Sequence, residues 1–186
     1  MENLHPEQTG IRPSFVFFKE SVNGNPVIGV EIGVDRGFNS AMMLTQLPTL
    51  TLYCVDPYER MYTHINGTDE LTRENVIARR NFSIDLLSMF GEERCKRVFK
   101  HSVEAAKDFQ DNYFDYIYID ADHHYQPIKA DLDAWYPKLK VGGVFGGHDY
   151  TLGCFGVLNA VNEFYGKKGV QFNTAPNGDF WSVKEK

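Results

Sequence analysis

The chain has 186 residues, of which 42% are hydrophobic and 24% charged, so it can bury one substantial core and we expect a single domain over residues 1–186. A formal net charge of -6 and a pI near 5.5 argue against nucleic acid as the main partner, because phosphate backbones bind basic surfaces. The three cysteines are scattered and form no CxxC pair, so they indicate neither a disulfide framework nor a zinc site.

The N-terminal extension, residues 1–25, has no basic segment followed by an apolar core. No run in the chain approaches the roughly 20 apolar residues of a membrane span. We therefore expect a cytoplasmic protein without a membrane partner, and the extension is one of the segments that could cover a substrate.

Short apolar runs of strand composition alternate along the chain with segments of helical spacing. The strand candidates are 26–33, 49–56, 97–102, 114–120 and 140–147. Runs that are apolar enough to be buried on both faces, with helices between them, predict a mainly parallel sheet in an open α/β fold. In such a sheet ligands bind at the carboxyl ends of the strands.

Two helices are predicted from their apolar spacing. The first carries Ile128, Leu132, Trp135 and Leu139 on one face, and Pro127 fits its first turn. The second has an apolar face at Val157, Leu158, Val161, Phe164 and Tyr165, and Gly166 can cap it. Two final runs, 169–175 and 179–184, flank a Pro-Asn-Gly turn, so we predict that the last strand is antiparallel.

The first predicted strand ends in "EIGVDRGFNS", where Gly33 and Gly37 let the backbone approach a ligand closely. Asn39 or Ser40 can cap the next helix, and its N-terminal amides would face the ligand. Tight packing is the alternative reason for the two glycines. A dinucleotide-binding fingerprint is excluded, because Asp35 stands where a further glycine is needed.

The next two strands end in polar residues that suit a nucleoside. Asp56 can accept hydrogen bonds from both hydroxyls of a ribose, although Asp56 before Pro57 is also an ordinary turn. Ser102 is placed to contact a base edge, although it could equally begin a helix. The irregular segment 57–69, which follows Asp56, is predicted to be mobile.

Carboxylates follow the last two parallel strands, in "IDADHH" and "GGHDY". Asp120, Asp122 and Asp149 would repel one another at adjacent strand ends unless a cation lay between them. A hard cation such as Mg²⁺ binds oxygen ligands and keeps several waters, so two or three protein ligands would be enough. The alternative is that these aspartates only cap helices or turns.

The segments "VEIGVDRGFNS", "YCVDPY", "HSVEAA", "IDADHHYQPIKADLDAWYPKLKVGGVFGGHDY" and "DFWSVK" together resemble class I S-adenosylmethionine-dependent methyltransferases. The likeness runs from about residue 27 to the end and is greatest to stand-alone O-methyltransferases of the macrocin type, with a more distant likeness to catechol and caffeoyl-CoA O-methyltransferases. The resemblance implies a Rossmann-like three-layer sandwich with a seven-stranded sheet in the order 3-2-1-4-5-7-6, in which strand 7 is antiparallel.

The resemblance also implies roles for the residues at the strand ends. Glu31, Gly33 and Gly37 would surround the methionine part of S-adenosylmethionine, Asp56 would hold its ribose and Ser102 would lie beside its adenine. Asp120 is a further expected cofactor-binding residue. A divalent cation, Mg²⁺ or another, would be held by Asp120, His148 and Asp149. His148 departs from the catechol-type pattern, which has a carboxylate there, and histidine suits softer ions better than Mg²⁺.

His123 matches the position of the base in the catechol and caffeoyl-CoA enzymes. An imidazole with a pKa near ~6.5 can take a hydroxyl proton at neutral pH. His124 is expected to be a solvent-facing neighbour or a helix cap. The predicted function is therefore O-methylation of a small hydroxylated molecule, a phenol, a catechol or a sugar.

Three other functions are compatible with the sequence to different degrees. A metal-independent methyltransferase could act on another acceptor atom, and a non-catalytic protein could bind S-adenosylmethionine without turnover. A dehydrogenase fits poorly, because of Asp35. Aromatic side chains at Tyr58, Tyr62, His64, Tyr150 and Phe155 could line the acceptor pocket. A chain this short could also use a second copy, as a homodimer, to cover that pocket.

Overall fold

The computed structural model describes residues 10–59 and 72–185. Seven strands form one sheet in the order β3-β2-β1-β4-β5-β7-β6, as predicted. Neighbouring strands from β3 to β5 run parallel, whereas β7 is antiparallel to both β5 and β6. The strands are β1 (Val27–Ile32), β2 (Leu50–Val55), β3 (Cys95–Val98), β4 (Phe114–Ile119), β5 (Leu139–Gly147), β6 (Asn173–Thr174) and β7 (Phe180–Val183).

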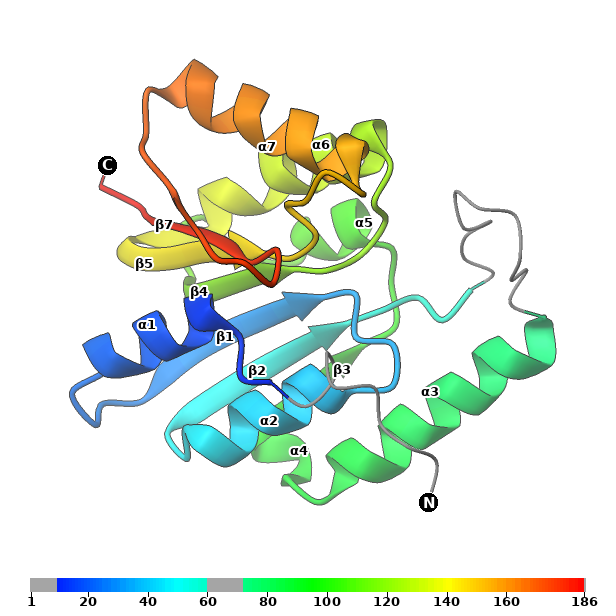
Figure 1. Cartoon of the computed structure of the whole chain (residues 1–186). Coiled ribbons are helices and arrows are strands. Elements are labelled where there is room, and N and C mark those ends of the chain that lie inside the picture. Colours follow the sequence, from blue (N-terminus) through cyan, green and yellow to red (C-terminus); the bar gives the residue numbers. More distant parts are fainter. Residues whose placement is uncertain (1–9, 60–71, 186) are drawn as a thin grey trace.

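Helices cover both faces of the sheet and make it the middle layer of three (Figure 1). One face carries α5 (Ser102–Ala106), α6 (Tyr125–Trp135) and α7 (Phe155–Lys168), and the other carries α1 (Pro13–Ser21), α2 (Phe38–Gln46), α3 (Arg73–Ser88) and α4 (Gly91–Arg94). A 3-10 turn, η2 (Tyr136–Lys138), follows α6. Within the described ranges, no helix is both long and apolar enough to span a bilayer.

The alternation of side chains along β4 creates two separate cores. Ile117 and Ile119 pack against the layer of α6 and α7, whereas Tyr116 and Tyr118 pack under α1 and α2. All four side chains are buried, so the strand is apolar on both faces. This double burial explains why the central strands could be predicted from short, continuous apolar runs.

The predicted third strand at 97–102 is wrong in its position. β3 pairs with β2 only from Cys95 to Val98, and α5 already begins at Ser102. The final hairpin is also shorter than predicted, because β6 contains two residues only. Its turn does form as expected, with the Gly178 amide donating to the Ala175 carbonyl at 3.0 Å.

Both predicted helices end at different residues from those expected. Leu139 does not extend the first helix, because α6 ends at Trp135 and Leu139 begins β5. Pro137 accounts for this end, since it cannot donate a backbone hydrogen bond to continue a helix. At the end of α7 the cap is Gly169, with φ of 65°, and Gly166 lies within the helix.

Candidate functional site

The carboxyl ends of β1, β4 and β5 lie side by side. Ile32 pairs with Ile119, and Ile119 pairs with Gly147, so the residues that follow these strands meet at one edge of the sheet. Gly33, Asp120, His148 and Asp149 are thereby brought together, as the sequence predicted for adjacent strand ends. This edge holds the candidate functional site.

Gly33 is required by a close approach of two backbones. Its φ is 88°, and a Cβ atom at this position would lie 2.0 Å from the carbonyl oxygen of Asp120. The Asp120 amide donates to the Ile32 carbonyl at 2.8 Å, which holds the two strand ends together. The packing explanation for Gly33 is therefore correct, and the same packing lets the chain turn toward α2 directly above β1.

Glu31 is buried below this turn and has two hydrogen-bond donors from α2. Asn39 Nδ2 donates to Glu31 Oε1 at 2.8 Å, and Ser40 Oγ donates to Glu31 Oε2. The predicted capping role of Asn39 and Ser40 is wrong, because their side chains turn to Glu31 instead. Burial raises the pKa of Glu31 to about 8, although these two hydrogen bonds oppose the shift.

The N-terminus of α2 consequently has no side-chain cap. Its N-cap residue is Gly37, with φ of 80° and no side chain to accept from the first-turn amides. A helix N-terminus carries partial positive charge and unpaired N–H groups, which suit an anionic or polar ligand. The first turn of α2 thus fits the polar end of a small molecule.

Asp56, at the end of β2, accepts backbone hydrogen bonds from two turns. Its Oδ2 receives the amides of Val34 at 3.0 Å and Asp35 at 2.9 Å, and its Oδ1 receives the Tyr58 amide at 2.8 Å. The turn explanation for Asp56 is therefore correct as far as it goes. Each carboxylate oxygen has two lone pairs, so Oδ1 keeps acceptor capacity for a ligand hydroxyl.

Ser102 is the first residue of α5, and its hydroxyl accepts a hydrogen bond from Trp135 Nε1 at 2.9 Å. The buried Asp131 of α6 lies beside it. Burial raises the pKa of Asp131 to about 7, and a hydrogen bond with Ser102 opposes the shift. Ser102 is thus held in place by two residues of α6, Trp135 and Asp131, neither of which was predicted to have a role in the site.

The acidic and imidazole groups of the site form one compact cluster. Asp120, His123 and Asp149 each offer one ligand atom within 4.8 Å of the others, and they are the only such group of three among the described residues. His123 Nε2 lies 2.9 Å from Asp149 Oδ2 and 3.8 Å from Asp120 Oδ1. Two carboxylates and one imidazole are a donor set that fits a divalent cation, and more readily Mn²⁺ or a softer ion than Mg²⁺.

The two carboxylates strongly favour the protonated form of His123. Asp120 and Asp149 together raise the pKa of His123 to about 10. Burial opposes ionisation of Asp149, but hydrogen bonds from His123 and His148 lower its pKa nonetheless. In this charge state the imidazole is a cation between two anions, and it becomes a proton acceptor only when another positive charge compensates its partners.

His148 and His123 contact different carboxylate oxygens of Asp149. The Nδ1 atom of His148 is 3.3 Å from Asp149 Oδ1, whereas its Nε2 atom is buried and has no hydrogen-bond partner among the described residues. His148 is not a member of the group of three ligand residues, Asp120, His123 and Asp149, that lie together in the described part of the chain. The neighbouring Asp149 has φ of 62°, a left-handed conformation that turns its carboxylate toward His123.

His124 and Asp122 pair with each other and are not members of this cluster. His124 Nδ1 lies 2.6 Å from Asp122 Oδ1, and the His124 side chain is 54% exposed. His124 stands at the N-cap position of α6, but its side chain makes no capping hydrogen bond there, so only the solvent-facing role predicted for it is seen. The two adjacent histidines therefore differ completely in their surroundings.

One site residue has no precedent in the sequence patterns. Arg12, at the start of α1, places Nη2 3.3 Å from Asp120 Oδ2. No motif could have revealed it, because 108 residues separate the two partners.

Two of the aromatic residues predicted to line the acceptor pocket lie in the described part of the chain: Tyr150 is half-buried and Phe155 is exposed. Tyr62, His64 and residues 60–69 of the segment predicted to be mobile lie outside the described residues.

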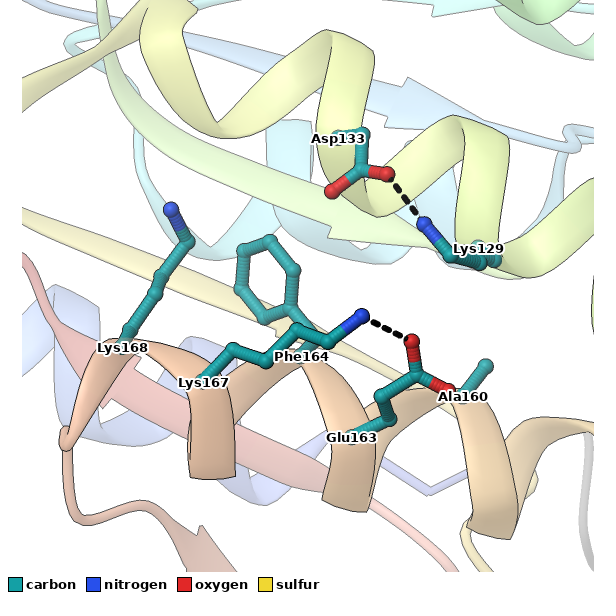
Figure 2. Close-up of a pocket in the computed structure, with 7 residues that line it drawn as sticks. All are labelled: Lys129, Asp133, Ala160, Glu163, Phe164, Lys167 and Lys168. Carbon is teal, nitrogen blue, oxygen red and sulfur yellow. Dashed lines mark hydrogen bonds and ion pairs between the residues drawn. The ribbon is translucent and has the colours of Figure 1, made fainter.

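A separate pocket of about 230 Å³ lies between α6 and α7, within the helical layer (Figure 2). It is lined by Lys129, Asp133, Ala160, Glu163, Phe164, Lys167 and Lys168. Lys129 pairs with Asp133 at 2.7 Å and Lys167 pairs with Glu163, so the pocket's charges largely compensate one another. None of the predicted site residues lines it.

Comparison with known proteins gives one family and a consistent fold. A family model described as a methyltransferase domain matches residues 30–150. A search of curated proteins found no match. The structure is similar to a caffeoyl-CoA O-methyltransferase candidate from Staphylococcus aureus, with 18% identity over 93% of this chain and 83% of the other and a TM-score of 0.65.

Two further solved structures have the same fold. Precorrin-6y C5,15-methyltransferase from Geobacter metallireducens is 16% identical over 93% of this chain and 87% of its own, with a TM-score of 0.64. The O-methyltransferase NovP is 20% identical over 92% of this chain and 79% of its own, with a TM-score of 0.61. At such identities these three similarities establish the architecture alone.

Proposed function

The chain belongs to the methyltransferase-domain family and has the fold of class I S-adenosylmethionine-dependent enzymes, and from this premise we propose that it methylates a hydroxyl oxygen of a small molecule with the help of a divalent cation. The observation that carries the proposal is the cluster of Asp120, His123 and Asp149 at the carboxyl ends of β4 and β5. An imidazole and two carboxylates lie together there, immediately beside the glycine turn after β1.

The residues around the turn fit the cofactor S-adenosylmethionine. The uncapped N-terminus of α2 and the turn from Gly33 to Gly37 would face its methionine part, with Glu31 fixing the turn from below. Asp120 would attract the ammonium group. Asp56 keeps acceptor capacity for the ribose, and Ser102 would lie at the adenine. The cofactor supplies the methyl group.

Asp120 and Asp149 are the ligands that the proposal assigns to the cation, and His148 is the third ligand predicted from the sequence. Mg²⁺ or Mn²⁺ would supply positive charge that favours the ionised form of the acceptor hydroxyl. His148 contacts Asp149 directly, so it could also orient that carboxylate. The protein's own contribution is to hold the two carboxylates and the acceptor in a fixed geometry.

His123 is the proposed base. It would take the proton from the acceptor hydroxyl through Nε2, the atom that faces both aspartates. If a bound cation compensated the charges of Asp120 and Asp149, the pKa of the His123 imidazole would return toward the ordinary value near ~6.5, where a proton can be accepted at neutral pH. No covalent intermediate with the protein is needed.

The test is a methyl-transfer screen over catechols, phenolic acids and sugars, with formation of S-adenosylhomocysteine as the readout. The purified protein is assayed after chelation and again after addition of Mg²⁺ or Mn²⁺. We expect turnover that a chelator abolishes and a divalent cation restores. Undiminished turnover in excess chelator would instead establish a metal-independent methyltransferase.

A binding measurement separates the second alternative. If the protein binds S-adenosylmethionine in a calorimeter but forms no S-adenosylhomocysteine with any hydroxylated acceptor, it is a non-catalytic cofactor-binding protein. The compact cluster of Asp120, His123 and Asp149 supports the enzyme instead. The exposed side chains of Leu152 and Phe155, in and next to the loop after β5, support an acceptor with an apolar face.

A further inference from the structure

Arg12 brings a positive charge from the N-terminal helix to the edge of the sheet. Helix α1 packs on the same face of the sheet as α2 (Figure 1). Its N-cap residue, Arg12, reaches Asp120 with Nη2 at 3.3 Å from Oδ2. Both side chains are largely buried, with 15% and 21% of their surfaces exposed. A partly buried pair of this kind is screened less by solvent than a surface ion pair.

A buried hydrogen-bond network fixes the start of α1. The Ser14 amide donates to Asp179 Oδ2 at 2.8 Å, and Tyr118 donates to Asp179 Oδ1 at 2.7 Å. The Ser14 hydroxyl shares a hydrogen bond of 2.9 Å with the Tyr116 hydroxyl. Asp179 is fully buried and comes from the hairpin before β7. The guanidinium of Arg12 is therefore placed by the fold rather than by a chance surface contact.

The pair of charges is complementary to an amino-acid group. Asp120 presents a carboxylate and Arg12 a guanidinium at adjacent positions, so together they match an ammonium and a carboxylate on one carbon atom. The described contact uses one of the two terminal nitrogens of Arg12, and a guanidinium has five N–H donors in a planar fork. A ligand carboxylate could therefore bind without breaking the contact with Asp120.

We propose that Arg12 binds a ligand carboxylate at the carboxyl ends of β1 and β4, and that this carboxylate is the one on the amino-acid part of the cofactor. The inference rests on the proposed function, because it assumes that S-adenosylmethionine occupies the turn after β1. A carboxylate on the acceptor is the other source of the same chemistry. Arg12 lies outside residues 30–150, so the family match does not assign it.

The test compares two ligands that differ only in the carboxylate. S-adenosylhomocysteine and S-adenosyl-3-thiopropylamine share the adenosine, the thioether and the amine, and the second has no carboxylate. Calorimetry is performed with the unmodified protein, Arg12→Gln and the control Lys19→Gln. Lys19 lies at the other end of α1 and contacts Gln46, so it matches the charge change away from the site.

We expect the unmodified protein and Lys19→Gln to prefer S-adenosylhomocysteine by about 10- to 100-fold, the strength of a charged hydrogen-bonded contact. In Arg12→Gln this preference should fall at least tenfold, through loss of affinity for the carboxylate ligand only. Arg12→Lys keeps the charge without the planar fork and should retain an intermediate preference for S-adenosylhomocysteine. If Arg12→Gln fails to fold, Arg12→Lys still tests whether Arg12 binds the carboxylate.

A second arm examines the acceptor, with turnover of catechol compared with that of 3,4-dihydroxybenzoate. If Arg12→Gln changes only the ratio between these two, the carboxylate that Arg12 binds belongs to the acceptor and the cofactor assignment is wrong. An unchanged ratio in both arms overturns carboxylate recognition by Arg12 and leaves the proposed function intact. If the unmodified protein binds neither adenosine ligand, the proposed function itself fails.

Discussion

His123 and His124 follow one another in the chain, yet only His123 faces the two aspartates of the site. We predict that His123→Ala lowers kcat by about 10²- to 10⁴-fold, because the acceptor proton loses its base, while the affinity for S-adenosylmethionine changes little. His124→Ala is the matched control, since the exposed His124 ring pairs with Asp122 and is not part of the cluster. Steady-state kinetics and calorimetry on both variants provide the measurement, and equal kcat values would remove His123 from the reaction.

Glu31 should make stability depend on pH. Its pKa is raised from 4.5 to about 8 in the folded chain, so folding favours the protonated form. This contribution to stability is fully present below pH 4.5 and is lost as pH rises through 8. We predict that Glu31→Gln, which cannot ionise, becomes more stable relative to the unmodified protein between pH 5 and pH 9, by up to a few kcal/mol.

Urea unfolding at several pH values measures this difference, and a difference that stays constant with pH would contradict the prediction.

The same Glu31→Gln substitution should weaken binding of S-adenosylmethionine. Above pH 8 the ionised carboxylate accepts from Asn39 and Ser40 through two oxygens, whereas the amide has one acceptor oxygen, so the turn after β1 loses part of its support there. Glu31 thus lowers stability at high pH while it organises the site.

At the scale of elements, the turn between β1 and α2 depends on Gly33. A methyl group there would collide with the Asp120 carbonyl, and the φ of 88° already disfavours any other residue. We predict that Gly33→Ala destabilises the protein by roughly 3 kcal/mol or more, through backbone displacement together with strain. Gly24→Ala is the control, because its φ is 74° but nothing lies within 4 Å.

The control should cost about 1 kcal/mol, the strain of the left-handed conformation alone. Chemical unfolding of the two variants gives the comparison directly. Similar losses in both would mean that the strand ends can separate without cost. In that case the close approach of the ends of β1 and β4 would not be needed to keep the site in its described geometry.

Sequence patterns correctly located those strands whose positions are visible in local composition. β1, β2, β4 and β5 lie within a residue or two of their predicted ranges, because buried parallel strands are continuous apolar runs. β3 was displaced because its end depends on how far β2 can pair with it. The strand-end rule brought Asp120 and Asp149 together, but it could not give the orientation of His123 between them.

Specific side-chain contacts between segments far apart in the chain could not be predicted from the sequence. Asn39 and Ser40 looked like caps, since local sequence cannot reveal a buried acid on the neighbouring strand. Arg12 lies outside every quoted segment, and Asp179 begins the segment "DFWSVK" without any local sign of its role, because each has a partner more than 100 residues away. Residues that complete a site from outside its family motif require a structure to be found.

At the scale of the whole molecule, Asp179 connects the N-terminal helix to the C-terminal hairpin. We predict that Asp179→Asn lowers the free energy of unfolding by about 1–3 kcal/mol, because a buried carboxylate that accepts two hydrogen bonds is replaced by an amide with one acceptor. Hydrogen exchange should show reduced protection in α1 and unchanged protection in α3. Asp111→Asn is the control, since Asp111 is an exposed carboxylate whose ion pair, with Lys138, lies away from Asp179 in the chain.

The meeting of α1 and the C-terminal hairpin also affects how this domain could be recombined with relatives. Both segments lie outside residues 30–150, and they contact each other through Ser14 and Asp179. If residues 30–150 alone were replaced by those of a relative, the relative's strand ends would be combined with Arg12 and the C-terminal hairpin of this chain. Ligand selectivity should therefore be transplanted by grafting both flanks as a pair, and single-flank grafts should yield folded proteins with weakened cofactor affinity.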